Sequence, residues 1–221
     1  MYWSFRYHSN SSWSDLQEII GTSMTVFDST IPHYPVYMIL EHLESSYKIT
    51  LPSSYTMKTF EPKYAKQWVL LMLHTGLVKD IQEGMDYMEQ TFLANLEETK
   101  QKMFLVVDEK DEVVGSCSLW TGKHFPQLPY RLHWLAVDEN HQCKGIAKAL
   151  VFRCLQLYKS YHLDKPLYLA TQTNSYIAIS FYLSIGFLPF TMQPINSTLT
   201  KQNYATQQEN AWRIIKECIN K

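Results

Sequence analysis

Residues 132–187 constrain the fold of this chain more than any other segment. An apolar run at 134–137 leads through a turn at Gly145 into the helical pattern 147–158. A chain that leaves a strand, turns at a glycine and enters a helix presents unbonded backbone N–H groups, and the helix dipole adds partial positive charge at the same point. The segment therefore predicts a binding site for a phosphate or pyrophosphate group.

The remaining sequence predicts an alternation of strands and helices. Strands are expected at residues 36–40, 55–60, 103–107, 113–120, 132–137, 167–171 and 187–191. Helices are expected at residues 15–20, 61–73, 81–100, 147–161, 176–184 and 205–219. The strands on either side of the turn at 108–111 should be antiparallel, and the strand–helix–strand unit that follows should be a right-handed parallel crossover. An α/β (α+β) fold follows, in which a mixed sheet carries helices on both faces.

The bulk composition excludes several classes of function. The chain of 221 residues is 46% hydrophobic, which supports a full core, and its net charge of -1 offers no basic surface for nucleic acid. Four cysteines at positions 117, 143, 154 and 218 lack the spacing of a zinc site or a disulfide framework, so reduced thiols and no metal are expected. No apolar run approaches the roughly 20 residues that span a membrane, and no signal segment is visible, so a cytoplasmic location is expected.

Two motifs narrow the interpretation of the glycine turn. The turn contains Gln-x-x-Gly-x-Ala at residues 142–147, and a later helix contains Ala-x-x-x-Tyr-x-x-x-Gly-Phe at residues 178–187. In this order and spacing, the chain resembles the GNAT superfamily of N-acetyltransferases over about residues 55–190, and in particular a bacterial branch of it. The resemblance implies a mostly antiparallel central sheet with a parallel β-α-β core that binds acetyl-CoA.

The resemblance places acetyl-CoA, as the acetyl donor, around the glycine turn. Backbone N–H groups would hold the pyrophosphate, and Gly145 would let the phosphates approach the main chain. Main-chain groups of the preceding strand would pair with the pantetheine arm, beside a bulge that separates the central strands. The expected cofactor-binding residues are Leu135, Ala136, Val137, Gln142, Cys143, Lys144, Gly145, Ile146, Ala147, Lys148, Asn174 and Ser175.

Several of these assignments have alternatives. Lys144 or Lys148 either adds charge for the phosphates or is a solvated lysine at the start of the helix. Many family members have an asparagine seven residues before the motif tyrosine. Here Ser175 has that position and Asn174 precedes it, so either supplies the polar contact. Cys143 is interpreted as an incidental small residue, because the family transfers acetyl directly to an amine.

Tyr182 and His133 are the expected catalytic residues. The resemblance implies that Tyr182 lies near the thioester sulfur, where its hydroxyl protonates the leaving thiolate; the alternative is a packed aromatic side chain. His133 is the candidate general base because its pKa suits proton transfer near neutral pH. Strand alternation points it toward the cleft if Leu135 and Val137 share its side of the sheet. The alternative is a histidine whose hydrogen bonds are satisfied within the sheet.

Other polar and aromatic residues are candidates for the wall of the acceptor pocket. They are Gln172, Trp134, His124 and Tyr130. The loop at 125–129 either shapes this pocket or merely connects strands.

Three parts are expected along the chain. Residues 1–54, rich in Ser, Tyr, His and Pro, form an N-terminal extension packed on the core, residues 55–195 the acetyltransferase domain, and residues 196–221 a tail with an amphipathic helix. Many family members end in two strands after the Gly-Phe pair, whereas here a polar stretch and a helical pattern follow. The strand at 36–40 is therefore expected to fill the missing place or to cover another edge.

The expected function is transfer of acetyl from acetyl-CoA to the primary amine of a small molecule. Two alternatives remain open: N-acetylation of a protein or peptide, and a non-catalytic acyl-CoA sensor with the same fold. The expected partner is a small-molecule amine, with no nucleic acid and no membrane, and a homodimer is left open.

Overall fold

The computed structural model describes residues 30–220, and it contains the helices and strands that follow. The strands are β1 (Pro35–Leu40), β2 (Thr56–Thr59), β3 (Met103–Val107), β4 (Val113–Thr121), β5 (Tyr130–Val137), β6 (Leu167–Gln172) and β7 (Leu188–Phe190). The helices are α1 (Ala65–His74), α2 (Ile81–Tyr87), α3 (Leu96–Lys102), α4 (Ile146–Ser160), α5 (Tyr176–Ser184) and α6 (Lys201–Ile219). The helix expected at 15–20 lies outside the described residues.

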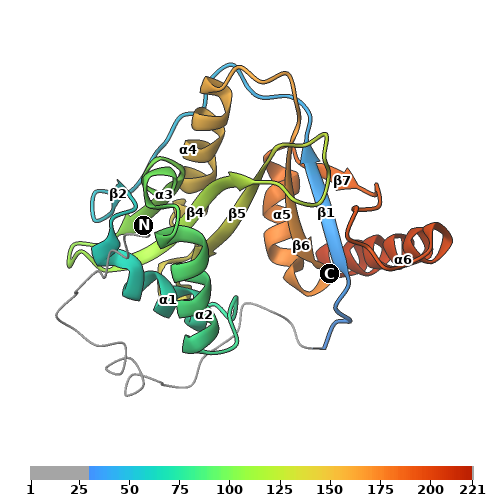
Figure 1. Cartoon of the computed structure of the whole chain (residues 1–221), viewed down its shortest axis with the longest axis horizontal. Coiled ribbons are helices and arrows are strands. Elements are labelled where there is room, and N and C mark those ends of the chain that lie inside the picture. The colour runs from blue at the N-terminus through green and yellow to red at the C-terminus, as the bar shows by residue number, and fades with distance from the viewer. Residues whose placement is uncertain (1–29, 221) are drawn as a thin grey trace, which may run out of the picture.

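One sheet joins these strands in the order β2-β3-β4-β5-β6-β1-β7. Every pair is antiparallel except β5 and β6, which are parallel and connected through α4. Figure 1 shows β2 at one end of the sheet and α6 at the other, beside β1 and β7. The mixed, mostly antiparallel sheet that the sequence predicts is confirmed.

Helices cover both faces of the sheet because its central strands are buried on both sides. In β3, Phe104 and Val106 belong to the core under α4, whereas Leu105 and Val107 belong to the core around Trp68 of α1. This alternation is the two-residue period of a strand, and it explains why β3 is apolar throughout. The two cores define an α4–α5 face and an α1–α3 face of the sheet.

The helix expected at 81–100 is divided into three pieces. α2 continues into a π-helical segment, Met88–Leu93, before α3 begins. Met88 and Phe92 of this segment are both fully buried, and Thr99 Oγ1 of α3 donates to Phe92 O at 2.8 Å. A π turn holds an extra residue, which rotates the side chains that follow it. The apolar period of the sequence did not reveal this break, because the buried residues keep a near-helical spacing.

Strand β1 lies inside the sheet, between β6 and β7. It pairs antiparallel with both, and Met38 lies opposite Leu169 on one side and Pro189 on the other. Its apolar side chains serve both faces: Met38 belongs to the core under α4, and Tyr37 belongs to a third cluster with Phe125 and Tyr168. Of the two alternatives for 36–40, covering an outer edge is excluded, and β1 instead takes a place within the sheet between β6 and β7.

A bulge in β5 interrupts the regular pairing of strands in the middle of the sheet. Ser116 of β4 faces Ala136 and Ser118 faces His133, so one residue of β4 opposes two of β5. Trp134, inside the bulge, has a φ of 53°, which is uncommon for a residue with a side chain. On its other side β5 pairs with β6 only through Arg131 and Leu132. The bulge implied by the resemblance is present, and β5 and β6 part beyond it.

Replacing Met38 with alanine should destabilise the protein, because Met38 is fully buried in the middle of β1. The expected loss in the free energy of unfolding is about 2–5 kcal/mol, measured by urea denaturation. Ile195→Ala is the control, because Ile195 is 69% exposed, and its effect should stay within about 0.5 kcal/mol. Equal unfolding midpoints for the two variants would show that β1 is not part of the cooperative core.

Candidate functional site

The turn between β5 and α4 has the geometry of an anion site. Gly145 caps the helix with a φ of 81°, and a Cβ built there would meet only Thr50 O, at 3.9 Å. Helical hydrogen bonding begins with Ala149 N donating to Gly145 O, and no side chain caps the N–H groups of the first turn. These N–H groups and the dipole of a 15-residue helix face an open approach.

Polar side chains from two distant segments surround this turn. Lys144 Nζ donates to Asn140 O at 2.9 Å and to Tyr55 Oη at 3.2 Å. Tyr55 Oη also lies 2.9 Å from His141 Nδ1. Lys148 is exposed, with its ammonium 5.3 Å from the ring centre of Phe152. The sequence offered no signal for Tyr55, because only the fold brings the segment before β2 to this turn.

The end of β5 presents an unpaired edge toward β6. Asp138 N donates to Val114 O of β4, so the N–H and C=O of the preceding Val137 point away from β4. Among the described strands, β6 pairs with β5 only at Arg131 and Leu132. Gln142 Nε2 donates to Val137 O at 3.2 Å, across the mouth of this edge. An extended chain can therefore add to residues 135–137 as a short strand would.

Tyr182 lies on the α4–α5 face, near the bulge. Its ring is 8% exposed, packs against Phe181 and Phe187, and belongs to the same core as Cys117, the β4 residue opposite the bulge. Burial raises the pKa of the Tyr182 hydroxyl, and the nearby Cys117 thiol raises it further. The hydroxyl has no hydrogen bond within residues 30–220, so a protonated donor is available there.

Asn174 and Ser175 precede α5. Asn174 Oδ1 is buried and has no hydrogen-bond partner, and Ser175 is 7% exposed. A buried amide oxygen without a donor is costly, and a ligand N–H group would remove that cost. Asn174 Oδ1 therefore has unused hydrogen-bonding capacity.

His133 lies on the α1–α3 face. Its Nε2 is 2.6 Å from Tyr87 Oη and 3.2 Å from Arg131 Nη2. A guanidinium can only donate, so Nε2 is the unprotonated, accepting nitrogen. Burial holds the pKa of His133 well below its usual range, and the positive charges of Arg131, His124 and Lys123 lower it further. The ring is therefore neutral at physiological pH.

The bulge changes which residues of β5 share a side. Simple alternation would place His133 with Leu135 and Val137, but these two pack against the core under α4 while His133 contacts Tyr87 of α2. The extra residue at Trp134 shifts the alternation by one. His133 therefore does not share a side of the sheet with Leu135 and Val137, which was the condition for pointing it toward the cleft. Its ring faces α2 instead.

The other candidates for the wall of the acceptor pocket do not all lie on the same face of the sheet. His124 Nδ1 lies 3.0 Å from Tyr168 Oη, and burial, followed by the charge of Arg131, lowers the pKa of His124. Trp134 packs against the α1–α3 core, with its ring 4.8 Å from that of Tyr87. Tyr130 lies on the opposite face, with its ring 5.3 Å from Tyr161.

The loop after β4 and Gln172 are the remaining candidates for this wall, and two further side chains near His133 were not predicted. Phe125 and Leu128 of the loop are buried against Tyr168. Gln172 is half-buried at the end of β6. Arg131 and Tyr87 were not among the residues predicted from the sequence, although an arginine two residues before His133 on a strand is a readable signal that the two share a face.

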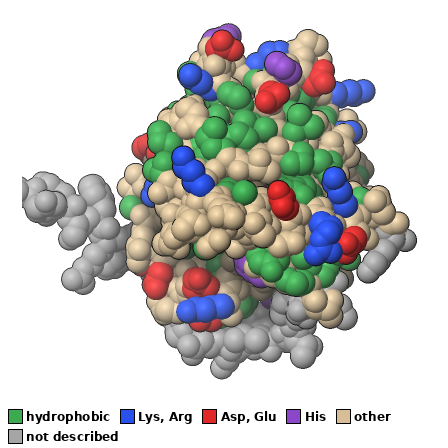
Figure 2. Space-filling view, turned by 90° about the vertical axis from the view of Figure 1, so that its right-hand side faces the viewer, with side chains coloured by type: hydrophobic (Ala, Val, Ile, Leu, Met, Phe, Trp, Pro, Cys, Tyr) green, Lys and Arg blue, Asp and Glu red, His purple; other side chains and the backbone are tan. Residues whose placement is uncertain are grey.

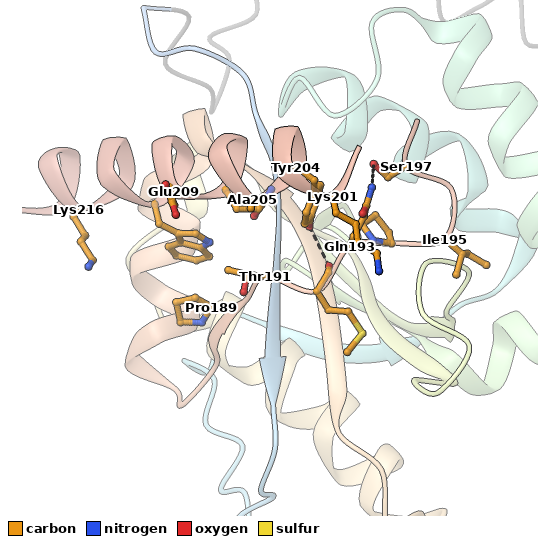
Figure 3. A pocket seen from close by; sticks show the side chains of 14 residues that line it. Pro189, Thr191, Gln193, Ile195, Ser197, Lys201, Tyr204, Ala205, Glu209 and Lys216 are labelled. Atoms are coloured by element: carbon orange, nitrogen blue, oxygen red, sulfur yellow. Dashed lines mark hydrogen bonds between the residues drawn. The ribbon is translucent and has the colours of Figure 1, made fainter. Parts of the chain in front are cut away.

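A separate cavity lies at the other end of the sheet. It measures about 880 Å³ and is bounded by α6 and the segment that follows β7. Tyr204 of α6 donates a hydrogen bond to the carbonyl oxygen of Met192, and Gln193 donates one to the hydroxyl of Ser197 (Figure 3). Figure 2, which views the molecule from the β7 and α6 side of Figure 1, shows apolar side chains gathered between scattered charges. None of the expected site residues lines this cavity.

Residues 30–220 contain neither a metal-binding cluster nor a helix that could span a membrane. No cluster of three or more His, Cys, Asp or Glu side chains there could hold a metal ion. In the same residues no helix is long and apolar enough to cross a membrane.

Comparison with known proteins identifies the family to which the chain belongs. A family model described as Acetyltransferase (GNAT) family matches residues 66–187, more than half of the chain. A GCN5-related N-acetyltransferase from Sphaerobacter thermophilus has 16% identity and a TM-score of 0.54, with 72% of this chain and 50% of that chain covered. A tandem GNAT protein from the clavulanic acid biosynthesis pathway has 16% identity and a TM-score of 0.55, with 74% and 52% covered.

A GNAT-family acetyltransferase from Colwellia psychrerythraea is similar to the same degree, with 15% identity, a TM-score of 0.52, and 70% and 52% covered. The chain therefore spans about half the length of these solved structures. At such identities the likeness concerns the fold alone. No curated protein matches the chain.

Acidification should destabilise the fold through His133. The unfolded chain binds a proton at this histidine below about pH 6.5, whereas the folded protein, with its lowered pKa, does not. The free energy of unfolding should therefore fall as pH decreases below about 6.5, by up to about 1.4 kcal/mol per pH unit. Urea denaturation at pH 7.5, 6.5 and 5.5 measures this slope. His133→Gln should make the free energy of unfolding less dependent on pH. An unchanged pH dependence would contradict the lowered pKa of His133 in the folded protein.

Proposed function

Because the chain belongs to the GNAT family of acetyltransferases, we propose that it transfers acetyl from acetyl-CoA directly to the primary amine of a small molecule. The observation that carries the proposal is the coincidence of two features at one end of β5. An uncapped helix N-terminus at Gly145 lies next to the unpaired edge 135–137. Acetyl-CoA needs both, since it carries a pyrophosphate and an amide-containing arm.

The residues around the turn fit the donor. The first-turn N–H groups of α4, from Ile146 to Lys148, hold the pyrophosphate, and Lys144 stands beside them as a cation. Residues 135–137 supply backbone groups to the pantetheine arm, and Asn174 Oδ1 accepts from one of its amides. Bound acetyl-CoA supplies an activated acetyl group and a thiolate leaving group.

Tyr182 is the proposed general acid. A tyrosine hydroxyl is protonated at neutral pH, and this one lies at the edge of the core beside Cys117, so it is proposed to donate a hydrogen bond, and then the proton, to the departing sulfur. Its position beside the core residue Cys117, opposite the bulge, supports a role at the point where β5 and β6 part.

His133 and Tyr87 are proposed to receive the proton of the amine. His133 is neutral and its accepting Nε2 lies 2.6 Å from Tyr87 Oη. Tyr87 Oη is therefore set to pass a proton to the imidazole while it accepts one from the acceptor side.

No cysteine among the described residues is set up as a nucleophile. Cys117 is fully buried and Cys143 belongs to the phosphate turn, which supports direct transfer of acetyl to the amine over an acetyl-enzyme intermediate.

A panel of primary amines, assayed for release of free CoA, tests the function. Release that depends on one class of amine supports the enzyme. Tight binding of acetyl-CoA without release for any amine or peptide would instead support a non-catalytic sensor. The panel includes peptides with free N-termini, so that protein acetylation is distinguished from small-molecule acetylation.

Gly145→Asp should abolish binding of acetyl-CoA. The new carboxylate would stand against the pyrophosphate, in a backbone conformation with a φ of 81°. Isothermal titration calorimetry measures the affinity. Gly76→Asp is the matched control, because Gly76 has a φ of 70° and lies just after α1, so it carries a similar backbone strain without a phosphate neighbour. Unchanged affinity in the Gly145 variant would refute the phosphate site.

Tyr182→Phe should reduce kcat by about 100-fold or more while the affinity for acetyl-CoA stays the same. The variant removes the hydroxyl and keeps the packed ring. Tyr158→Phe is the control, because Tyr158 is a buried tyrosine whose hydroxyl bonds Lys165 O of the chain itself. Steady-state release of CoA measures kcat. A rate equal to that of the control would remove Tyr182 as the acid.

A further inference from the structure

Arg131 is a half-buried cation without a carboxylate partner. Its Nε is buried and makes no hydrogen bond, and Nη2 contacts His133 Nε2 at 3.2 Å. No ion pair found among residues 30–220 includes Arg131. Buried guanidinium groups are normally paired with an anion, because an unpaired charge inside a protein is energetically costly. Arg131 therefore has unused capacity for an anionic group.

The surroundings of Arg131 are also positive. The charges that act on His133 come from Arg131, His124 and Lys123, and all of them disfavour its protonated form. The charge that acts on His124 comes from Arg131. No carboxylate contributes at either histidine. This region repels a second cation and attracts an anion.

Arg131 stands at the point where the sheet opens. It faces Tyr168 of β6, and pairing between β5 and β6 ends one residue later. Ala170, two residues beyond Tyr168 on the same face of β6, is exposed, although Tyr37 of β1 pairs with it on its other side. An exposed alanine in the middle of a paired strand marks open space above it. Ala170 lies on the same face of the sheet as Arg131 and His133.

The phosphates of acetyl-CoA are too far away to be the missing partner. Arg131 and the end of β5 at Val137 are separated by six residues of strand, which is roughly 20 Å, and the phosphate turn lies beyond that end. The anion must therefore come from the other substrate.

We propose that Arg131 binds a carboxylate of the acceptor, so that the substrate is an amino acid or another amine with a carboxylate near its amino group. This inference rests on the proposed function and names the substrate class. A guanidinium binds a carboxylate with two parallel hydrogen bonds, which orients the substrate as well as holding it. The acceptor amine is then held on the face of Tyr87 and His133.

Matched pairs of acceptors test the proposal. Phenylalanine with phenethylamine, leucine with isopentylamine, and lysine with cadaverine each differ by the carboxylate alone. For at least one pair, kcat/KM of the wild-type protein should be about tenfold or more higher for the amino acid. Binding of the N-acetyl forms of the same compounds, measured by calorimetry, gives a readout that does not depend on turnover.

Arg131→Gln should lower the ratio of kcat/KM for the amino acid to kcat/KM for the matched amine by about 10- to 100-fold, because any effect on His133, which Arg131 contacts, is common to both substrates. Arg131→Lys keeps the charge without the two-pronged geometry and should recover part of the difference. Arg213→Gln is the control, because Arg213 is an exposed residue of α6 paired with Glu217. Unchanged affinity for acetyl-CoA in all three variants shows that the fold is intact.

The outcomes separate this inference from the function on which it rests. A wild-type protein that does not bind acetyl-CoA overturns the proposed function. A protein that binds acetyl-CoA but prefers the decarboxylated member of every pair overturns the carboxylate site alone. The carboxylate site is likewise overturned if Arg131→Gln lowers both members of a pair equally, or if N-acetyl amino acids bind wild type and Arg131→Gln alike.

Discussion

The parting of β5 from β6 at the bulge is the constraint on which the rest of the site depends. One extra residue at Trp134 turns the end of β5 away from its parallel neighbour, so pairing stops after Leu132. The backbone beyond it is left unpaired next to the start of α4. The same extra residue moves His133 to the face opposite Leu135. A single irregularity thus creates the edge for the donor and assigns the proposed acid and base to opposite faces of the sheet.

Strand β1 holds together the part of the sheet that lies beyond β5, because it pairs with both β6 and β7. β6 pairs with β5 at only two of its six residues, but it pairs with β1 along its whole length. β1 in turn pairs with β7, which follows α5 and the proposed acid Tyr182. A segment far away in sequence therefore stabilises the side of the cleft that carries Tyr182. Tyr55, which follows the same segment, stabilises the other side through its contacts with Lys144 and His141.

Most of the fold could be predicted from the sequence, because period and turn chemistry are local. The bounds of α5 and β3 agree with the expectation at every residue, and the glycine turn leads into α4 as expected. The break of 81–100 into α2, a π segment and α3 could not be predicted, because a π turn alters the backbone and leaves the apolar spacing nearly unchanged. The contact of Tyr87 with His133 could not be predicted either, since it depends on how α2 packs on β5. The shared face of Arg131 and His133 was readable from their spacing on one strand, but the absence of a carboxylate partner among residues 30–220 was not.

The sequence by itself determined the family, the order of the elements and the glycine turn at which the donor is proposed to bind. These follow from a short run of residues around Gly145, in which strand, turn and helix start are adjacent along the chain. Only the tertiary structure brought together the residues of the proposed acceptor end. There Arg131, His133, Tyr87 and the open space at Ala170 come from three elements, and the absence of a carboxylate beside Arg131 among residues 30–220 is visible only when they are packed together. The physical reason is that a backbone anion site is a local property, whereas the charge balance of a buried side chain depends on every element around it.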